Sequence, residues 1–174
     1  DAQRIRPLIH LAQIAEEYLS DINRAILCYT EVLLYNAHHR EALDSLARIY
    51  ETTENWDEYL RVIRLSIEAC AKEAEKEKDA EKLNSILSSL YFKYGSVLET
   101  KYNKVDDAIE YYKKSIEYNA SSLPALHGLR DIYLRRENWN GVLRTLDLEA
   151  KIWDDSKEKA GIYTQMGNIL MEKL

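Results

Sequence analysis

Histidines and paired carboxylates are the side chains of this sequence whose types and spacing could do chemistry. His38 and His39 are adjacent, so on a helix they point in different directions, and a metal ion there would need further, distant ligands. The acidic pairs Asp106-Asp107 and Asp154-Asp155 fall in expected turns or first helical turns, where negative charge stabilises a helix N-terminus. We therefore expect neither a metal site nor an acid/base pair among them.

Motifs with a known catalytic geometry are absent from the sequence. It has no glycine-rich phosphate loop, no Gly-x-Ser-x-Gly, no Cys-x-x-Cys and no His-Glu-x-x-His. His10 and His127 stand alone among apolar neighbours, which favours packing or surface roles over metal ligation. We predict a protein that is not an enzyme and that has no catalytic, cofactor or metal site.

Charge and composition narrow the classes of partner. The net charge of −6 and the pI near 5.3 argue against nucleic acid, because proteins that bind it normally carry a basic stripe. No apolar run approaches the roughly 20 residues of a spanning helix, so we expect no membrane insertion. Cys28 and Cys70 lie on apolar faces of expected helices, where a free thiol is usually buried, and this weakly favours a cytoplasmic location.

The elements that position these residues come from an internal repeat. The stretch from Ala42 to Trp56 returns 83 residues later as Ala125 to Trp139, with Ala-Leu-x-x-Leu-x-x-Ile-Tyr-x-x-x-Glu-Asn-Trp in both copies. Only 5 Gly and 2 Pro occur, and the apolar positions recur at spacings of three and four rather than two. The sequence therefore predicts an all-α fold built from repeated helical hairpins.

Helix starts and stops divide the repeat into units. Pro7 suits a first helical turn, and the apolar residues that follow it run to about Leu19; Asp21, Asn55 and Pro124 mark further helix starts. We predict units of about 8–37, 40–78, 79–120 and 123–153 and a final helix of 156–173, all within one solenoid of residues 1–174. Because the chain opens without Met and inside a repeat, we expect it to be a piece of a longer protein.

Four segments share one further pattern: Leu11-x-x-Ile14-Ala15-x-x-Tyr18, Leu43-x-x-Leu46-Ala47-x-x-Tyr50, Tyr91-x-x-Tyr94-Gly95-x-x-Leu98 and Tyr163-x-x-Met166-Gly167-x-x-Leu170. They resemble the first-helix signature of tetratricopeptide repeats, and the chain resembles long bacterial arrays of that family. The resemblance implies a right-handed α-solenoid of antiparallel hairpins, with about four and a half repeats here. It also implies that the aromatic positions, Trp56 and Trp139 among them, pack between helices.

Departures from the family pattern fall at the unit junctions and in the second copy. Ala37 and Ala120 replace the proline that usually separates units, and Arg130 stands where the small first-helix residue should be. The first double unit is 11 residues longer than the second, about three helical turns, and the extra residues fall within Ala71–Lys82. We interpret it as two lengthened helices meeting near Lys78-Asp79, which either form a solvated extension or serve as a docking or spacer element.

Members of this family generally bind a peptide or partner protein on the concave surface lined by the first helix of each hairpin. The resemblance places eight residues of this sequence at outward positions there: Asp44, Arg48, Phe92, Ser96, His127, Asp131, Arg135 and Asn168. Phe92 is the aromatic among them, and we expect no clamp for a terminal carboxylate. The function implied is a non-catalytic scaffold for a protein or peptide partner. Two alternatives stay open: self-association through exposed repeat ends, and a module of a larger enzyme or transport protein.

Overall fold

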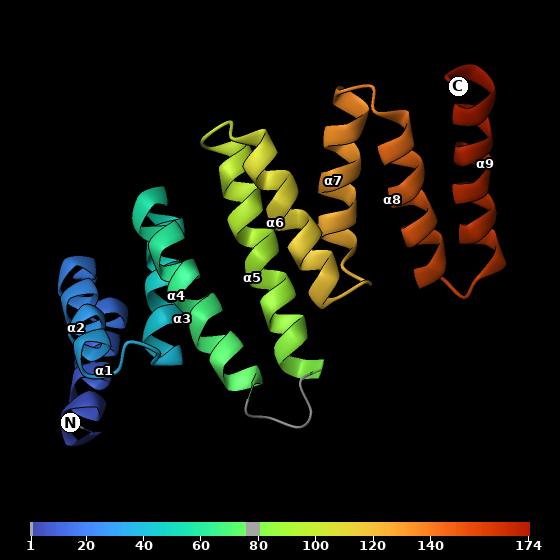
Figure 1. The fold of residues 1–174 in the computed structure, drawn as a ribbon. Helices are drawn as coiled ribbons and strands as arrows, with labels where there is room; N and C mark the ends of the chain where they lie inside the picture. The colour runs from blue at the N-terminus through green and yellow to red at the C-terminus, as the bar shows by residue number, and fades with distance from the viewer. Residues whose placement is uncertain (1, 76–80) are drawn as a thin grey trace. The chain divides into compact units, whose positions relative to one another are not determined.

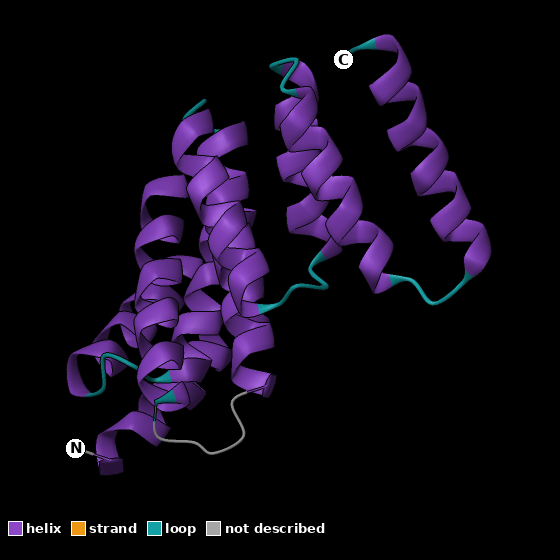
Figure 2. Cartoon of the chain, turned by 45° about the vertical axis from the view of Figure 1, so that its right-hand side comes forward, coloured by secondary structure: helices purple, strands orange, loops and turns teal. Residues whose placement is uncertain are grey.

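The computed structural model describes residues 2–75 and 81–174, and these ranges hold nine α-helices and no strand (Figures 1 and 2). The predicted all-α fold of helical hairpins is confirmed. The helices are α1 (Ala2–Glu17), α2 (Ile22–Tyr35), α3 (Arg40–Thr52), α4 (Trp56–Ala74), α5 (Glu81–Thr100), α6 (Val105–Tyr118), α7 (Leu123–Arg135), α8 (Trp139–Ile152) and α9 (Ser156–Glu172). The chain forms two compact units, Asp1–Leu83 and Asn84–Leu174, which we call unit 1 and unit 2. The single solenoid stays a prediction.

Unit 1 contains the hairpins α1–α2 and α3–α4, which pack on each other through α2 and α3 (Figure 1). Small residues lie where α1 and α2 meet: Ala12, Ala15 and Ala25 have no exposed surface, and this lets the two backbones approach closely. Tyr29 and Val32 of α2 fill the remaining space and are 1% and 0% exposed. The thiols of Cys28 and Cys70 are buried and free, as the apolar pattern predicts.

The turn inside each of the four hairpins has the same backbone conformation. A residue with positive φ follows each first helix: Ser20 (51°), Glu54 (55°), Asn103 (54°) and Glu137 (52°). The next residue closes the helix it leaves, as in the bonds from Asn55 N to Tyr50 O and from Asn138 N to Tyr133 O, both 2.9 Å. The same asparagines then cap α4 and α8 through their side chains.

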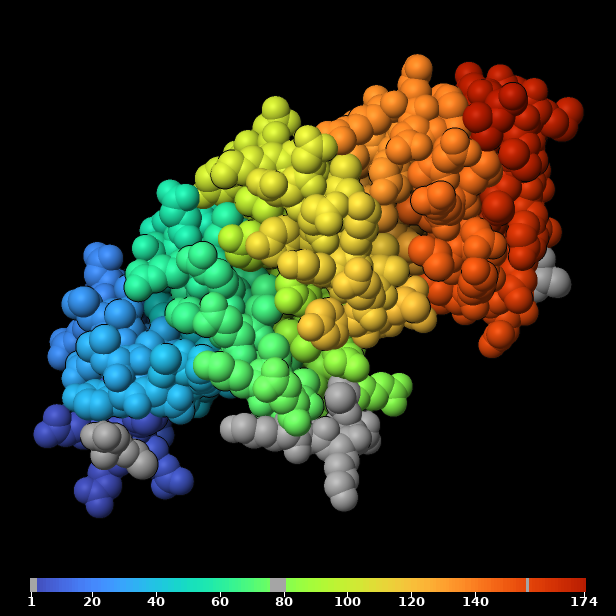
Figure 3. All heavy atoms as spheres, viewed as in Figure 1, coloured from blue at the N-terminus to red at the C-terminus, as the bar shows by residue number. Residues whose placement is uncertain are grey.

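Unit 2 contains the hairpins α5–α6 and α7–α8, followed by α9. Rings fill the α5–α6 interface, where Tyr94 stacks on Tyr111 with centroids 4.3 Å apart. The core of the second half comes from Val142, Leu146 and Ala150 of α8 and from Ile162 of α9. In the space-filling view the side chains of α7, α8 and α9 close the spaces between their ribbons (Figure 3).

Several predicted helix limits are correct, but those of the first helix are not. Asp21 and Asn55, two of the predicted helix starts, cap α2 and α4, and Pro124 lies in the first turn of α7. In contrast, α1 starts at Ala2, so Pro7 lies inside it, and the helix ends at Glu17. Tyr18 lies beyond its end and is 78% exposed, because Ile9, Ala12 and Ala15 form the buried face instead.

The two predictions on tryptophans and on the charged extension have different outcomes. Trp56 and Trp139 are half-buried rather than core residues, and each is the first residue of its helix. Trp56 meets the buried Tyr59 edge-on, with centroids 5.8 Å apart.

The predicted meeting point of the two lengthened helices, Lys78-Asp79, lies outside the described residues, between the end of α4 at Ala74 and the start of α5 at Glu81.

Candidate protein-binding groove

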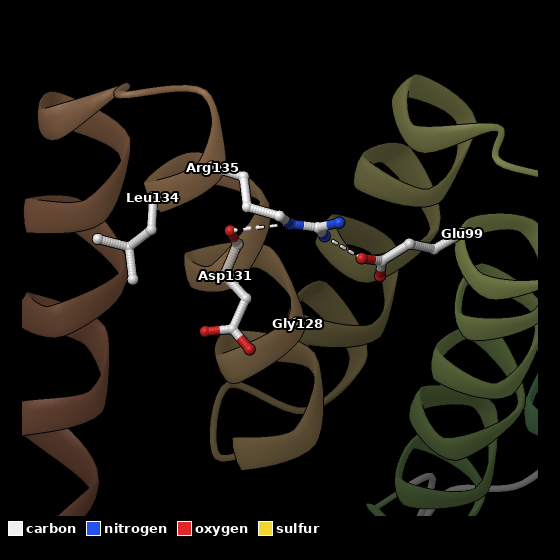
Figure 4. A pocket seen from close by; sticks show the side chains of 5 residues that line it. All are labelled: Glu99, Gly128, Asp131, Leu134 and Arg135. Atoms are coloured by element: carbon white, nitrogen blue, oxygen red, sulfur yellow. Dashed lines mark hydrogen bonds and ion pairs between the residues drawn. The ribbon is translucent and has the colours of Figure 1, made fainter.

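A groove of about 470 Å³ lies on unit 2 between α5 and α7 (Figure 4). It opens to solvent, and its lining residues are Glu99 of α5 and Gly128, Asp131, Leu134 and Arg135 of α7. Both helices are the first helix of their hairpin, and the first-helix surface is the one that the family resemblance implies for binding. We call this site the α5/α7 groove.

Glu99 is the acceptor at the centre of one wall. Its carboxylate accepts a hydrogen bond of 2.7 Å from the hydroxyl of Tyr112 and also binds the Arg135 guanidinium. The Glu99 side chain is 15% exposed and the Arg135 side chain 58%, so the glutamate is fixed while the arginine reaches solvent. Burial, then the bond to Glu99, raises the pKa of Tyr112, so its hydroxyl stays protonated and keeps donating.

Gly128 lets α7 approach α6 at the floor of the groove. A Cβ atom at this position would lie 2.9 Å and 3.0 Å from two ring carbons of Tyr112. Because Tyr112 is 2% exposed and is fixed by Glu99, its ring has little room to move. The glycine is therefore required by packing.

The Asp131 carboxylate is a negative charge in the groove that is not paired with Arg135. The Nε of Arg135 donates to the backbone carbonyl of Asp131 at 3.3 Å, while its other arm binds Glu99. Figure 4 shows the Asp131 carboxylate pointing away from that ion pair. Asp131 is exposed, so its carboxylate is available to a ligand. With one arginine and two acidic residues, the lining has a net negative charge.

Phe92 and Ser96 of α5 are less exposed than their positions in the pattern imply. Phe92 is half-buried, because its ring stacks on Tyr112 with centroids 5.7 Å apart and an interplanar angle of 25°. Ser96 is also half-buried and hydrogen bonds the Tyr112 side chain. Phe92 thus stacks on Tyr112, which in turn holds Glu99, and its role as a contact residue stays a prediction.

A second polar cluster joins α7 to α8. The Glu149 carboxylate, 12% exposed, binds Arg130 and lies 3.2 Å from Nε2 of His127. Arg130 replaces the small first-helix residue of the repeat pattern, so an ion pair occupies the place where a close helix contact would lie. His127 thus faces α8 as well as solvent, and it does not line the α5/α7 groove.

Unit 1 has a related but shifted arrangement on α1 and α3. Glu16 binds Arg48, and Glu16 and Glu99 occupy the same place in the 83-residue repeat, as do Tyr29 and Tyr112. At the repeat position of Arg48 unit 2 has Asp131, and its arginine comes one helical turn later at Arg135. With the arginine one turn later, Glu99 of unit 2 stays paired, and the Asp131 carboxylate is placed on the surface as well. Sequence comparison of the two copies shows the substitution but not the ion pairs.

The remaining predicted contact residues do not line this groove. Asp44 is exposed on α3 in unit 1, where its neighbour Glu41 accepts a 3.0 Å hydrogen bond from Gln13. Asn168 is exposed on α9. Of the eight predicted residues, the groove brings together Asp131 and Arg135. It is also lined by Glu99, which the repeat pattern likewise places at an outward first-helix position, and by Gly128 and Leu134 of α7.

Residues 2–75 and 81–174 contain no group of three or more His, Cys, Asp or Glu side chains that could hold a metal ion. None of the described helices is both long enough and apolar enough to cross a membrane.

Comparisons with known proteins find likenesses among solved structures. No protein-family model and no curated protein matches the chain. A crystal structure of MamA aligns with 91% of this chain and 97% of its own, at 18% sequence identity and a TM-score of 0.39. A second crystal structure of MamA covers 100% of this chain and 98% of its own, at 17% identity and a TM-score of 0.38. The assignment to tetratricopeptide repeats therefore still depends on the repeated motifs of the sequence.

Proposed function

We propose that the chain is a non-catalytic scaffold that binds a peptide segment of a partner protein in the α5/α7 groove. The observation that carries this proposal is the exposed Asp131 carboxylate beside the fixed pair of Glu99 and Arg135. An open groove with a few fixed polar groups favours recognition of another chain over chemistry on a small molecule.

The negative charge of the groove favours a ligand with a basic residue. Arg135 is already bound by Glu99, so an incoming lysine or arginine meets Asp131 without displacing a cation of the protein. Leu134, 40% exposed, offers an apolar contact next to it. We therefore propose a ligand segment with a basic residue followed or preceded by an apolar one, and we expect its binding to weaken as salt is raised.

Preorganisation supports the same proposal. Tyr112 anchors Glu99, and Phe92 stacks on the Tyr112 ring, so the groove wall is held by side chains that are buried or half-buried. A wall that is already ordered loses little conformational entropy when a ligand binds. The ligand then bears most of the ordering cost, as a flexible peptide segment would.

The test is a selection from a library of random peptides on the wild-type protein, followed by affinity measurements on two variants. Asp131→Lys reverses the charge of the groove, and Asp147→Lys makes the same change on α8, outside the groove lining. We expect the selected peptides to be enriched in Lys or Arg and to bind Asp131→Lys at least tenfold more weakly, with Asp147→Lys close to wild type. Peptides that bind both variants equally well would refute the choice of groove.

The other predicted contacts stay part of the proposal as secondary sites. Asp44 and Arg48 present a carboxylate and a cation on the first-helix surface of unit 1, and Asn168 presents an amide on α9. We propose that each of them is a separate contact site on its own unit for a larger partner protein. Asp44→Lys should then weaken binding of a full-length partner and leave the affinity of a short groove peptide unchanged.

A further inference from the structure

A second pocket, of about 220 Å³, lies within unit 1 between α2, α3 and α4. Its walls include Leu33 of α2, Leu46 and Tyr50 of α3, and Val62 and Leu65 of α4. Leu46 and Val62 are 2% and 3% exposed, so the base of the pocket is part of the packed interior of unit 1. We call this site the α2/α4 pocket, after the second helices of the two hairpins (Figure 1).

Exposed leucines on α2 lead to the mouth of this pocket. Leu34 lines the pocket and is 81% exposed, and Leu27, seven residues earlier on the same side of the helix, is 69% exposed. Seven residues span about 10.5 Å along a helix. On the α4 side of the pocket, Arg61 pairs with Glu58 at 3.4 Å. The apolar surface is therefore about two helical turns long and has a polar edge on α4.

The second copy of the repeat carries charged residues in place of these leucines. The positions 83 residues after Leu27 and Leu34 are Glu110 and Glu117 of α6, and both glutamates are exposed. Glu110 forms an ion pair of 2.9 Å with Lys113 on the same helix. The hairpin thus forms with charges at both positions, and the leucines of unit 1 are not needed to build it.

A continuation of the repeat does not account for the leucines either. In the sequence α6 has one hairpin before it and another after it, and Glu110 and Glu117 are nevertheless exposed. Further hairpins before α2 would therefore leave Leu27 and Leu34 exposed as well. The hairpin that follows α2 is already in place, and its helices α3 and α4 form the pocket without filling it.

The walls of the site determine which kind of ligand fits it. Because α2 and α4 pair their own backbone amides and carbonyls within each helix, they offer few backbone partners to an extended peptide. A helical ligand satisfies its own backbone groups, and two apolar residues seven apart on it match the spacing of Leu27 and Leu34. A small molecule that fits in 220 Å³ would not reach Leu27, and small-molecule sites usually measure about 300–1,000 Å³.

A second copy of this chain fits the site less well than a different protein does. If two copies met around the pocket through the same surface, their concave surfaces would face each other, and both pockets would stay partly empty. If this surface met a different surface of the next copy, the contact would link copies head to tail.

We propose that the α2/α4 pocket and the leucines Leu27 and Leu34 dock an amphipathic helix of a partner protein. One large apolar side chain of that helix enters the pocket beside Leu34, and a second, seven residues away, packs on Leu27. An acidic residue at the edge of the same helix reaches Arg61, whose side chain is 66% exposed. This site uses the second helices of the hairpins of unit 1, so it does not depend on the α5/α7 groove.

The test is a selection on the intact protein from a library of helical peptides with one face randomised. Leu34→Glu and Leu27→Glu are the test variants, because the second copy of the repeat carries glutamate at both positions in a folded hairpin. Leu134→Glu is the matched control, since it makes the same exchange at an exposed leucine of the α5/α7 groove. Circular dichroism checks that all three variants keep their helices.

We expect the selected helices to carry two large apolar residues seven positions apart and to bind Leu34→Glu at least tenfold more weakly than the wild type. Leu27→Glu should weaken binding at least threefold, and Leu134→Glu less than twofold. Equal affinities for Leu34→Glu and Leu134→Glu, an unchanged affinity for Leu27→Glu, or no enrichment of such helices would overturn the proposal. Self-association of the wild type that Leu34→Glu abolishes would overturn it too, because a second copy would then be the occupant.

Discussion

Replacing Gly128 with alanine should destabilise unit 2, although alanine is the better helix former. Helix propensity favours the substitution by about 1 kcal/mol. Against this, the new Cβ would lie 2.9 Å from a ring carbon of Tyr112, whose ring Phe92 stacks on and whose hydroxyl Glu99 binds. Overpacking of this kind costs about 1–3 kcal/mol. We expect a net loss of about 1 kcal/mol in the free energy of unfolding.

Gly167→Ala is the matched variant, because nothing lies within 4 Å of its new Cβ. There the propensity term acts alone, and we expect a gain of about 0.5–1 kcal/mol. Urea unfolding followed by circular dichroism should therefore move the midpoint down for Gly128→Ala and up for Gly167→Ala. A double-mutant cycle with Tyr112→Leu should remove most of the Gly128→Ala penalty. If Gly128→Ala raises the midpoint as much as Gly167→Ala does, the packing argument is refuted.

Two further predictions concern buried polar groups. Glu149→Gln removes the charge that holds Arg130, and because the glutamate side chain is 12% exposed we expect a loss of about 1–3 kcal/mol, read from the urea midpoint. A change below about 0.3 kcal/mol would show that the pair is as weak as a surface pair. Burial raises the pKa of Tyr59 to about 12 from an ordinary 10, so folding disfavours its ionisation. The free energy of unfolding should therefore fall between pH 10 and pH 12, by up to about 1.4 kcal/mol per pH unit. Tyr59→Phe should make this fall less steep. An unchanged slope in that variant would contradict the assignment of the fall to Tyr59.

The hairpins could be predicted from the sequence because their signals are local. Asn55 and Asn138 mark helix starts by their own side chains, and the repeat fixes the phase of the apolar positions around them. The structure adds that Glu54 and Glu137 adopt positive φ. No glycine marks those turns, so the backbone conformation could not be predicted from residue type.

The groove could be predicted only in part because its wall depends on packing between distant residues. The outward phase of Asp131 and Arg135 follows from the helix pattern, and both line the groove. The pairing of Glu99 with Arg135 joins residues 36 positions apart in sequence, and no local spacing indicates it. The contact of Phe92 with Tyr112 could not be predicted for the same reason, because the Tyr112 ring comes from α6.

Photo-crosslinking from position 131 tests the central proposal most directly. A photoreactive phenylalanine derivative replaces Asp131 in one protein and Asp147, on α8, in a control, and both proteins are irradiated with the peptides selected on the wild type. The aromatic replacement also removes the Asp131 carboxylate and so weakens binding. Irradiation is therefore done at peptide concentrations above the dissociation constant measured for the Asp131→Lys variant. The account predicts peptide adducts at position 131 and few at 147. Equal adducts at both positions, or adducts at 147 alone, would contradict a binding site between α5 and α7.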